Sequence, residues 1–233
     1  MSLKNITSLD LIEACQEPGC PVCNLQQKMV AGYLRMLFHE HINDPPSREK
    51  LRLSQGLCHT HLWLAIDNHL SNALAVTILS HDVLGKLLQD LDTLNPGSKP
   101  PGRIKNLLKS DQSKTGLDPE KPCPVCQHQA MVEEWICKVL IESIHQEELS
   151  TAIRQSEGIC LPHLRSTLAI KASAESQQIL ITLTRETWDA LHAELAEFIR
   201  KNDYRYSQEG FGEERDAWLR ASAAITGNRS LES

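Results

Sequence analysis

Two copies of the tetrapeptide Cys-Pro-Val-Cys, at 20–23 and 123–126, are the segments of this chain best suited to chemistry. Two cysteines separated by two residues can present both sulfurs to one metal ion from a turn or the start of a helix. Proline after the first cysteine suits a first helical turn. A helix N-terminus also favours the thiolate, which is the form that binds metals. The motif therefore predicts metal binding or thiol redox chemistry at two places.

A second motif, Cys-x-x-His, follows each copy. GLCHTHL lies at 56–62 and GICLPHL at 158–164, so both halves read Cys-Pro-Val-Cys, a long helical stretch, and a glycine-led Cys-x-x-His. The first motif repeats at an offset of 103 residues and the second at an offset of 102. Two motifs repeated in the same order at nearly the same spacing indicate an internal duplication.

Three sulfurs and one imidazole nitrogen in each half make a closed Cys₃His set, the kind that holds structural zinc. Such a set needs no open coordination position, so no hydrolytic role follows from it. We predict two zinc ions, each bound within one half of the duplication. The predicted ligands are Cys20, Cys23, Cys58 and His61 for the first ion, and Cys123, Cys126, Cys160 and His163 for the second.

Iron–sulfur clusters are an alternative cofactor. Cys15, Cys20 and Cys23 fit the Cys-x₄-Cys-x₂-Cys spacing that begins a plant-type ferredoxin site. However, the position that matches Cys15 in the second half is Asp118, and a duplicated site should not need a cysteine in only one copy. Zinc is therefore the favoured metal, with Cys15 outside the site.

Thiol redox chemistry is the alternative function. The tetrapeptide resembles the Cys-Pro-x-Cys motif of thioredoxin-like oxidoreductases, but those motifs lie in a βαβ context and no strand is predicted before either copy. Zinc-bound thiolates can still release their metal on oxidation, so redox sensing stays open. No phosphate-binding loop, nucleophile elbow or His-Glu-x-x-His helix is present. The sequence thus favours a non-catalytic binding or scaffold protein.

Apolar residues recur at spacings of three and four after each Cys-Pro-Val-Cys, which predicts helices. Aromatic residues are only 4% of the chain, and few segments alternate in the way that strands require. We therefore predict an all-α, internally duplicated helical bundle, with Cys137 at a core position. The predicted helical faces are Val30, Leu34 and Leu37; Leu74, Ile78, Leu84, Leu88 and Leu91; Val132, Ile136 and Val139; and Leu180, Leu183, Leu191, Leu195 and Phe198.

Breaks in these patterns divide the chain into four segments. The first repeat covers 1–98, a basic linker covers 99–122, the second repeat covers 123–206, and a tail covers 207–233. The linker is rich in Pro, Gly, Ser and Lys, which predicts an exposed tether. Within the first repeat the prolines of NDPP should stop a helix. The tail is expected to hold a short helix that begins at Glu213 and buries Trp218, Ala221 and Ile225.

Charge and hydropathy limit the remaining functions. A net charge of −6 argues against a general affinity for nucleic-acid phosphates. No run of about 18 apolar residues predicts a membrane span, and the first residues lack the apolar region of an export signal. Eight cysteines without such a signal predict a reducing, cytoplasmic location. A protein partner is expected, and the sequence predicts no oligomeric state.

The twin repeats and the C-terminal stretch at 188–221 resemble an uncharacterised bacterial family of unknown function. The resemblance covers nearly the whole chain and implies an all-helical protein, but it implies no catalytic activity. The tail residues could form a docking surface or fold back across the repeats. The residues that carry the resemblance, besides the cysteine pairs, are Asn43, Asp44, Pro45 and Arg48, and in the tail Asp203, Tyr204, Arg205, Glu213, Glu214, Asp216 and Trp218.

Overall fold

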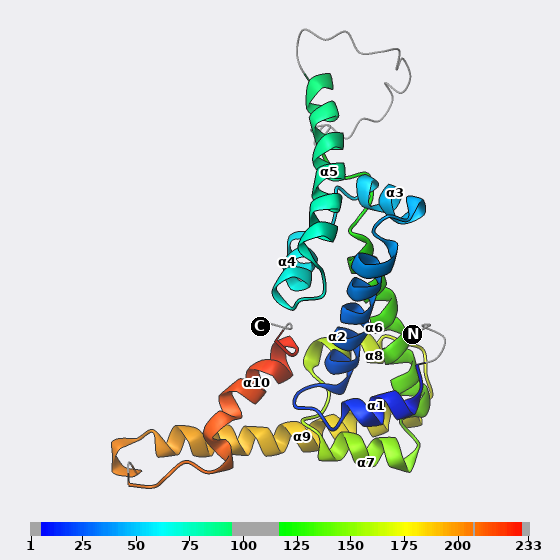
Figure 1. Cartoon of the computed structure of the whole chain (residues 1–233). Helices are drawn as coiled ribbons and strands as arrows, with labels where there is room; N and C mark the ends of the chain where they lie inside the picture. Colours follow the sequence, from blue (N-terminus) through cyan, green and yellow to red (C-terminus); the bar gives the residue numbers. More distant parts are fainter. Residues whose placement is uncertain (1–5, 95–116, 207, 230–233) are drawn as a thin grey trace. The chain divides into compact units, whose positions relative to one another are not determined.

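The computed structural model describes residues 6–94, 117–206 and 208–229, which form helices and no strand (Figure 1). The all-α prediction is therefore confirmed. Most of the predicted linker, 99–116, lies outside the described residues. The elements are α1 (Ser8–Ala14), α2 (Pro21–Met36), the π turn η2 (Leu37–His41), α3 (Pro45–Leu53), α4 (His59–Asp67), α5 (Ala73–Thr93), α6 (Pro124–Ser143), α7 (Glu147–Gln155), α8 (Leu161–Leu168), α9 (Ala174–Lys201), the 3₁₀ turns η3 (Tyr204–Tyr206) and η4 (Glu213–Asp216), and α10 (Ala217–Thr226).

Two compact units make up the described chain. The first unit contains the residues up to Met29 and those from Gln129 onward, and the second contains Val30–His128. The start of α2 and the end of α6 thus belong to the first unit, and the end of α2 and the start of α6 belong to the second. Each unit therefore contains segments of both repeats.

The first unit packs its core around α6 and α9. Ile136, Cys137, Leu140, Leu180 and Leu183 are all buried in one apolar cluster, as their helical spacing predicts. Helices α1 and α7 lie side by side, and α7 and α10 both contact the long helix α9 (Figure 1). The position predicted for Cys137 in the core is confirmed.

In the second unit, Leu34, Leu37 and Phe38 form the centre of the core. Ion pairs join α3 to α5, because Arg48 and Arg52 of α3 each lie 3.0 Å from a carboxylate oxygen of Asp82. Partial burial acts to raise the pKa of Asp82, but the hydrogen bonds from both arginines leave it below its ordinary value. The arginine of the Asn-Asp-Pro-x-x-Arg element therefore has a structural role.

The apolar stripe predicted on α5 is wrong except at Ile78, which is half-buried; Leu74 at the start of the helix is already exposed. Leu84, Leu88 and Leu91 are exposed, and the buried residues of this helix are Ala75 and Leu79. The reason is length. Helix α5 has 21 residues, about 32 Å, whereas its partner α3 has nine, about 14 Å. Among the described residues, α5 contacts mainly α3 and η2, and its ion pairs with α3 end at Asp82, so its second half lacks a comparable neighbour.

The break before α3 has a different role from the one predicted. The π turn ends at His41, and the prolines at 45 and 46 open the next helix instead of only ending the previous one. Asp44 caps α3, accepting a hydrogen bond from the backbone N–H of Ser47 at 3.3 Å. After α3, Gly56 has a φ of +86°, a conformation that glycine adopts without strain.

The tail folds back within the first unit, where α10 contacts α8 and α9. Glu214 accepts hydrogen bonds from Lys201 at 2.6 Å and from the backbone N–H of Gly212 at 2.9 Å. These bonds lower the pKa of Glu214 to about 2. The predicted apolar face of the tail helix is partly wrong, because Ala221 is buried together with Ala217 while Trp218 and Ile225 are exposed.

No helix in the described ranges combines the length and the apolar composition that crossing a membrane would require.

Candidate metal sites

Each of the four cysteine-containing motifs lies at the start of a helix. Cys20, Cys58, Cys123 and Cys160 directly precede α2, α4, α6 and α8. The carbonyl oxygen of each accepts the first helical hydrogen bond, at 3.0, 3.0, 3.1 and 2.8 Å respectively. In every motif the second ligand residue, a cysteine or a histidine, is the third residue of the helix and lies one turn after the first ligand. Two intervening residues therefore direct both side chains to one point beyond the helix end.

The structure gathers the eight predicted ligands into two groups of four. In each group the donor atoms all lie within 4.8 Å of one another. The prediction that each half of the duplication binds its own metal is wrong, because each group takes its Cys-x-x-Cys from one half and its Cys-x-x-His from the other. The first site comprises Cys20, Cys23, Cys160 and His163, and the second comprises Cys58, His61, Cys123 and Cys126.

The lengths of the helices explain why each group combines ligands from both halves of the duplication. Helix α2 and its π turn continue for 16 and 5 residues after Cys20, which carries the chain about 30 Å from that cysteine. The helix that follows, α3, has nine residues and spans about 14 Å, too little to return to the starting point before Cys58. Helices α6 and α7, with 20 and nine residues, repeat this relation in the other half. A Cys-x-x-His therefore cannot reach the Cys-x-x-Cys of its own half.

The first site has the dimensions of a tetrahedral ion. With usual zinc–ligand distances, two sulfurs lie about 3.8 Å apart, and a sulfur lies about 3.6 Å from the nitrogen. His163 Nδ1 lies 3.2 Å from Cys160 Sγ, 3.3 Å from Cys23 Sγ and 3.7 Å from Cys20 Sγ. Cys23 and Cys160 have their sulfurs 3.8 Å apart. All four residues are buried.

The second site has nearly the same dimensions. His61 Nδ1 lies 3.2 Å from Cys58 Sγ, 3.3 Å from Cys126 Sγ and 3.8 Å from Cys123 Sγ. The sulfurs of Cys58 and Cys126 are 3.6 Å apart. Burial differs from the first site, because Cys58 is half-buried and Cys126 is exposed. All these cysteines are free thiols, so every sulfur is available as a ligand.

Charge also suits a divalent cation at both sites. Three thiolates and one dication would leave a net charge of −1. Each site lies at the N-termini of two helices, α2 and α8 in the first unit, α4 and α6 in the second. A helix N-terminus carries roughly half a positive charge, so the two together offset this remaining charge. The donors thus fit a bound metal ion without requiring a further counter-charge.

Proton affinities within the sites are strongly altered by the crowding of donors. Burial opposes protonation of His163, yet hydrogen bonds to Cys160, Cys20 and Cys23 raise its pKa well above the ordinary value. Burial opposes ionisation of Cys123, yet hydrogen bonds from His61 and from nearby backbone N–H groups lower its pKa to about 6. A bound cation would displace the remaining protons, so metal binding is expected to weaken as the pH falls.

Asn228, close to the end of the described chain, covers the first site. Its backbone N–H donates to Cys23 Sγ at 3.3 Å, and its Oδ1 accepts from the backbone N–H of Cys20 at 2.8 Å. The side-chain amide also donates to Asn24 Oδ1 at 2.6 Å. A Cβ at Gly19 would lie 2.4 Å from the Asn228 amide, so only glycine allows this approach. We call these contacts the Asn228 clasp.

Glu133 lies behind the imidazole of the first site. Its Oε1 is 4.0 Å from Nε2 of His163, the ring nitrogen that does not face the sulfurs. Ser166 donates to the same carboxylate at 2.9 Å and Gln26 donates to it at 3.3 Å. A carboxylate behind a metal-binding histidine orients the ring and makes it a better ligand. Neither Glu133 nor Asn228 was identified from the sequence, since neither belongs to a repeated motif.

Replacing Asn228 with alanine is expected to destabilise the metal-loaded protein by about 1–3 kcal/mol, because the backbone N–H of Cys20 and the amide of Asn24 would lose their partner. Urea unfolding of the two proteins measures the difference. Asn202→Ala is a matched control. Within the described part of the chain, its exposed amide donates one hydrogen bond, to the carbonyl of Phe198 in the preceding helical turn, so a change below about 0.5 kcal/mol is expected. Equal stability of Asn228→Ala and the wild type would contradict a structural role for the clasp.

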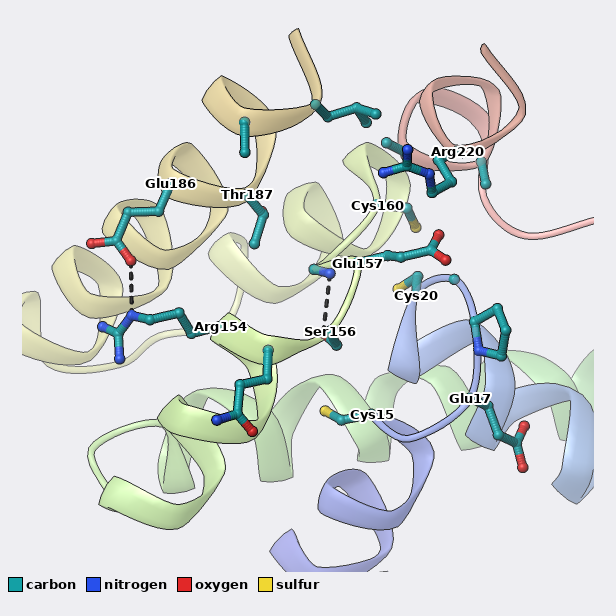
Figure 2. Close-up of a pocket in the computed structure, with 18 of the residues that line it drawn as sticks. Cys15, Glu17, Cys20, Arg154, Ser156, Glu157, Cys160, Glu186, Thr187 and Arg220 are labelled. Atoms are coloured by element: carbon teal, nitrogen blue, oxygen red, sulfur yellow. Dashed lines mark hydrogen bonds and ion pairs between the residues drawn. The ribbon is translucent and has the colours of Figure 1, made fainter. Parts of the chain in front are cut away.

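A cavity of about 640 Å³ borders the first site (Figure 2). Its lining includes Cys20 and Cys160 of the first site, and also Cys15, which lies outside both groups of donors. Burial raises the pKa of the Cys15 thiol to about 11, so it remains protonated at neutral pH. Arg154 in the lining is paired with Glu186 at 2.9 Å. The cavity therefore adds no ligand to the metal site.

The fold and the sites define a class: an all-helical protein with two Cys₃His groups, each suited to hold one metal ion. The chain belongs to a family of unknown function, DUF6062, whose model matches residues 1–232. Neither a search of curated proteins nor a search of solved structures found a match.

Proposed function

We propose that the protein is a zinc-stabilised helical scaffold with one structural Zn²⁺ in each unit. The observation that carries this proposal is that three sulfurs and one Nδ1 meet twice at tetrahedral spacing. All four positions of each ion would be filled by protein atoms, as in structural zinc sites. A protein partner for this scaffold stays a prediction.

The donor spacing favours a single ion over an iron–sulfur cluster. Donor atoms that all lie within 4.8 Å of one another enclose room for one ion, whereas a cluster with bridging sulfides needs its ligands further apart. The mixed donor set of three sulfurs and one nitrogen is common for structural zinc. Cys15, the additional cysteine of the ferredoxin-like spacing, is absent from both groups.

Each zinc ion would join two helix starts that are far apart in the sequence. In the first unit it would connect α2 to α8, and in the second it would connect α6 to α4. Cys23 and Cys160 are 137 residues apart, so their connection closes a long loop of chain. Zinc binding in small zinc peptides is worth roughly 10–16 kcal/mol, and much of that free energy could act as folding energy here.

Elemental analysis of anaerobically purified protein, together with an absorption spectrum, tests the proposal. We expect two zinc ions per chain and no absorption band in the visible region. If the protein contains iron and absorbs at about 400 nm, the sites hold iron–sulfur centres and the zinc assignment is wrong. Fewer than one ion of any metal per chain, also after reconstitution under reducing conditions, would refute metal binding itself.

A further inference from the structure

We propose that the second site is a thiol switch, in which peroxide oxidises Cys126 and Cys58 to a disulfide and releases the zinc ion, while the first site retains its metal. This inference rests on the proposed zinc binding and adds the regulation of one of the two sites. The basis is the unequal surroundings of two donor groups that otherwise have nearly the same geometry.

The donors of the first site are buried. Cys20, Cys23 and Cys160 are 3%, 5% and 1% exposed. The Asn228 clasp lies over Cys23, and a Cβ at Gly227 would be only 3.7 Å from the same sulfur. Cys20 and Cys160 border the cavity of about 640 Å³, but so little of each side chain is exposed that an oxidant reaches these thiolates far less readily than an exposed cysteine. The N–H donated by Asn228 also withdraws charge from the Cys23 sulfur, which lowers its nucleophilicity.

The second site is open at the equivalent position. Cys126 is the third residue of α6, as Cys23 is the third residue of α2, but Cys126 is exposed. A bound zinc ion would hold Cys126 as a thiolate, the form that reacts with peroxide. Exposure and thiolate character together determine which cysteine is oxidised first. They coincide at Cys126.

Cys58 is placed to complete the reaction. Its sulfur lies 3.6 Å from that of Cys126, so an approach of about 1.6 Å would bring the pair to the length of a disulfide bond. Cys58 is half-buried and directly precedes the short helix α4, whose nine residues follow it. A disulfide between these two would leave only Cys123 and His61 as donors, and two donors would not retain zinc.

The chemistry balances with hydrogen peroxide as the two-electron oxidant. The Cys126 thiolate attacks one peroxide oxygen, so an S–O bond forms, the O–O bond breaks, and hydroxide leaves and is protonated to water. The Cys58 thiolate then attacks the resulting sulfenic acid, so the S–S bond forms, the S–O bond breaks, and a second water leaves. Two thiolates have lost two electrons, peroxide and two protons have become two waters, and Zn²⁺ dissociates.

The test follows zinc release after peroxide addition to the two-zinc protein, with a chromogenic chelator as the indicator. We expect one zinc ion per chain to leave at least ten times faster than the other. Alkylation and peptide mapping at the end of the fast phase should show Cys126 joined to Cys58, with Cys20, Cys23 and Cys160 unmodified. Release of both ions with one rate constant would overturn the inference. A first disulfide that lacks Cys126, or that joins it to Cys123, would do the same.

Two variants sharpen the test. Cys126→His replaces the exposed sulfur by a nitrogen donor, so the zinc that the second site of this variant holds should no longer leave in the fast phase. Cys15→Ser removes one cysteine outside both sites and should keep the fast phase. A fast phase that survives Cys126→His would refute the role of Cys126. Elemental analysis before the oxidant is added separates the two hypotheses: a chain without zinc refutes the proposed function, whereas a two-zinc chain without a distinct fast phase refutes only the switch.

Discussion

A double variant with Cys20→Ser and Cys160→Ser is expected to retain one zinc ion per chain, whereas Cys20→Ser with Cys58→Ser is expected to retain none. The first two cysteines share one donor group, so the second substitution removes a ligand from a site that is already lost. Cys20 and Cys58 belong to different groups, so the second substitution destroys the remaining site. Binding within each half of the duplication would give the opposite result. Elemental analysis of the purified variants distinguishes the two arrangements.

Unfolding free energies give a second measurement of the same pairing, which is useful if loss of one metal weakens the other site. The losses of unfolding free energy from two substitutions in one site are strongly non-additive, because the first substitution already removes most of the stabilisation by the metal. The Cys20 and Cys160 pair should therefore cost little more than either single variant. The Cys20 and Cys58 pair should cost close to the sum. Cys15→Ser is the control, and it should keep both ions.

The sequence was sufficient to predict the helical class and the residues that the structure gathers into the two groups. Both depend on local spacing. A Cys-x-x-Cys beside proline indicates a helix start, and leucines at spacings of three and four indicate helices. Leu34, Leu180 and Leu183 are buried as this pattern requires. Local spacing determines which side of a helix a residue occupies, and this information is contained in a few consecutive residues.

The pairing of the motifs could not be read from spacing alone, because it depends on where the chain goes between them. The separation of Cys23 from Cys58 is compatible with one site only if the intervening chain returns. A helix from Pro21 through His41 followed by a nine-residue helix does not return. The lengths were partly visible in the sequence, since the apolar pattern after Cys23 extends to the prolines at 45 and 46. Comparing those lengths would have pointed to exchange between the halves.

Other features were beyond prediction because they depend on tertiary contacts of single residues. Asn228 reaches the first site from the end of the described chain, 208 positions from Cys20. Nothing around it is periodic. Similarly, Leu84 and Leu88 match an amphipathic pattern but are exposed, because the neighbouring helix α3 is shorter than α5. A hydrophobic stripe predicts a helix better than it predicts what covers that helix.

Removing both zinc ions with a high-affinity chelator is expected to lower the thermal midpoint by more than about 20 °C. The zinc contribution known from small zinc peptides, roughly 10–16 kcal/mol, is comparable with the whole stability of an ordinary domain, about 5–15 kcal/mol. For a chain of this size, each kcal/mol changes the midpoint by about 2–4 °C. Circular dichroism during heating measures the effect.

The physical reason for so large an effect lies in the helix starts. In the first unit, the metal would join α2 to α8 at the point where both helices begin and their three cysteines and one histidine converge. Without the cation, three sulfurs within 4.8 Å of one another must stay protonated, or their thiolates repel one another. The two helix ends then lose the main interaction that holds them together. Addition of zinc after chelation should restore the transition, and chelator already saturated with zinc should have no effect. A midpoint that falls by less than about 5 °C, in protein shown by elemental analysis to be metal-free, would mean that the helices pack without the ions and that the two groups serve another purpose.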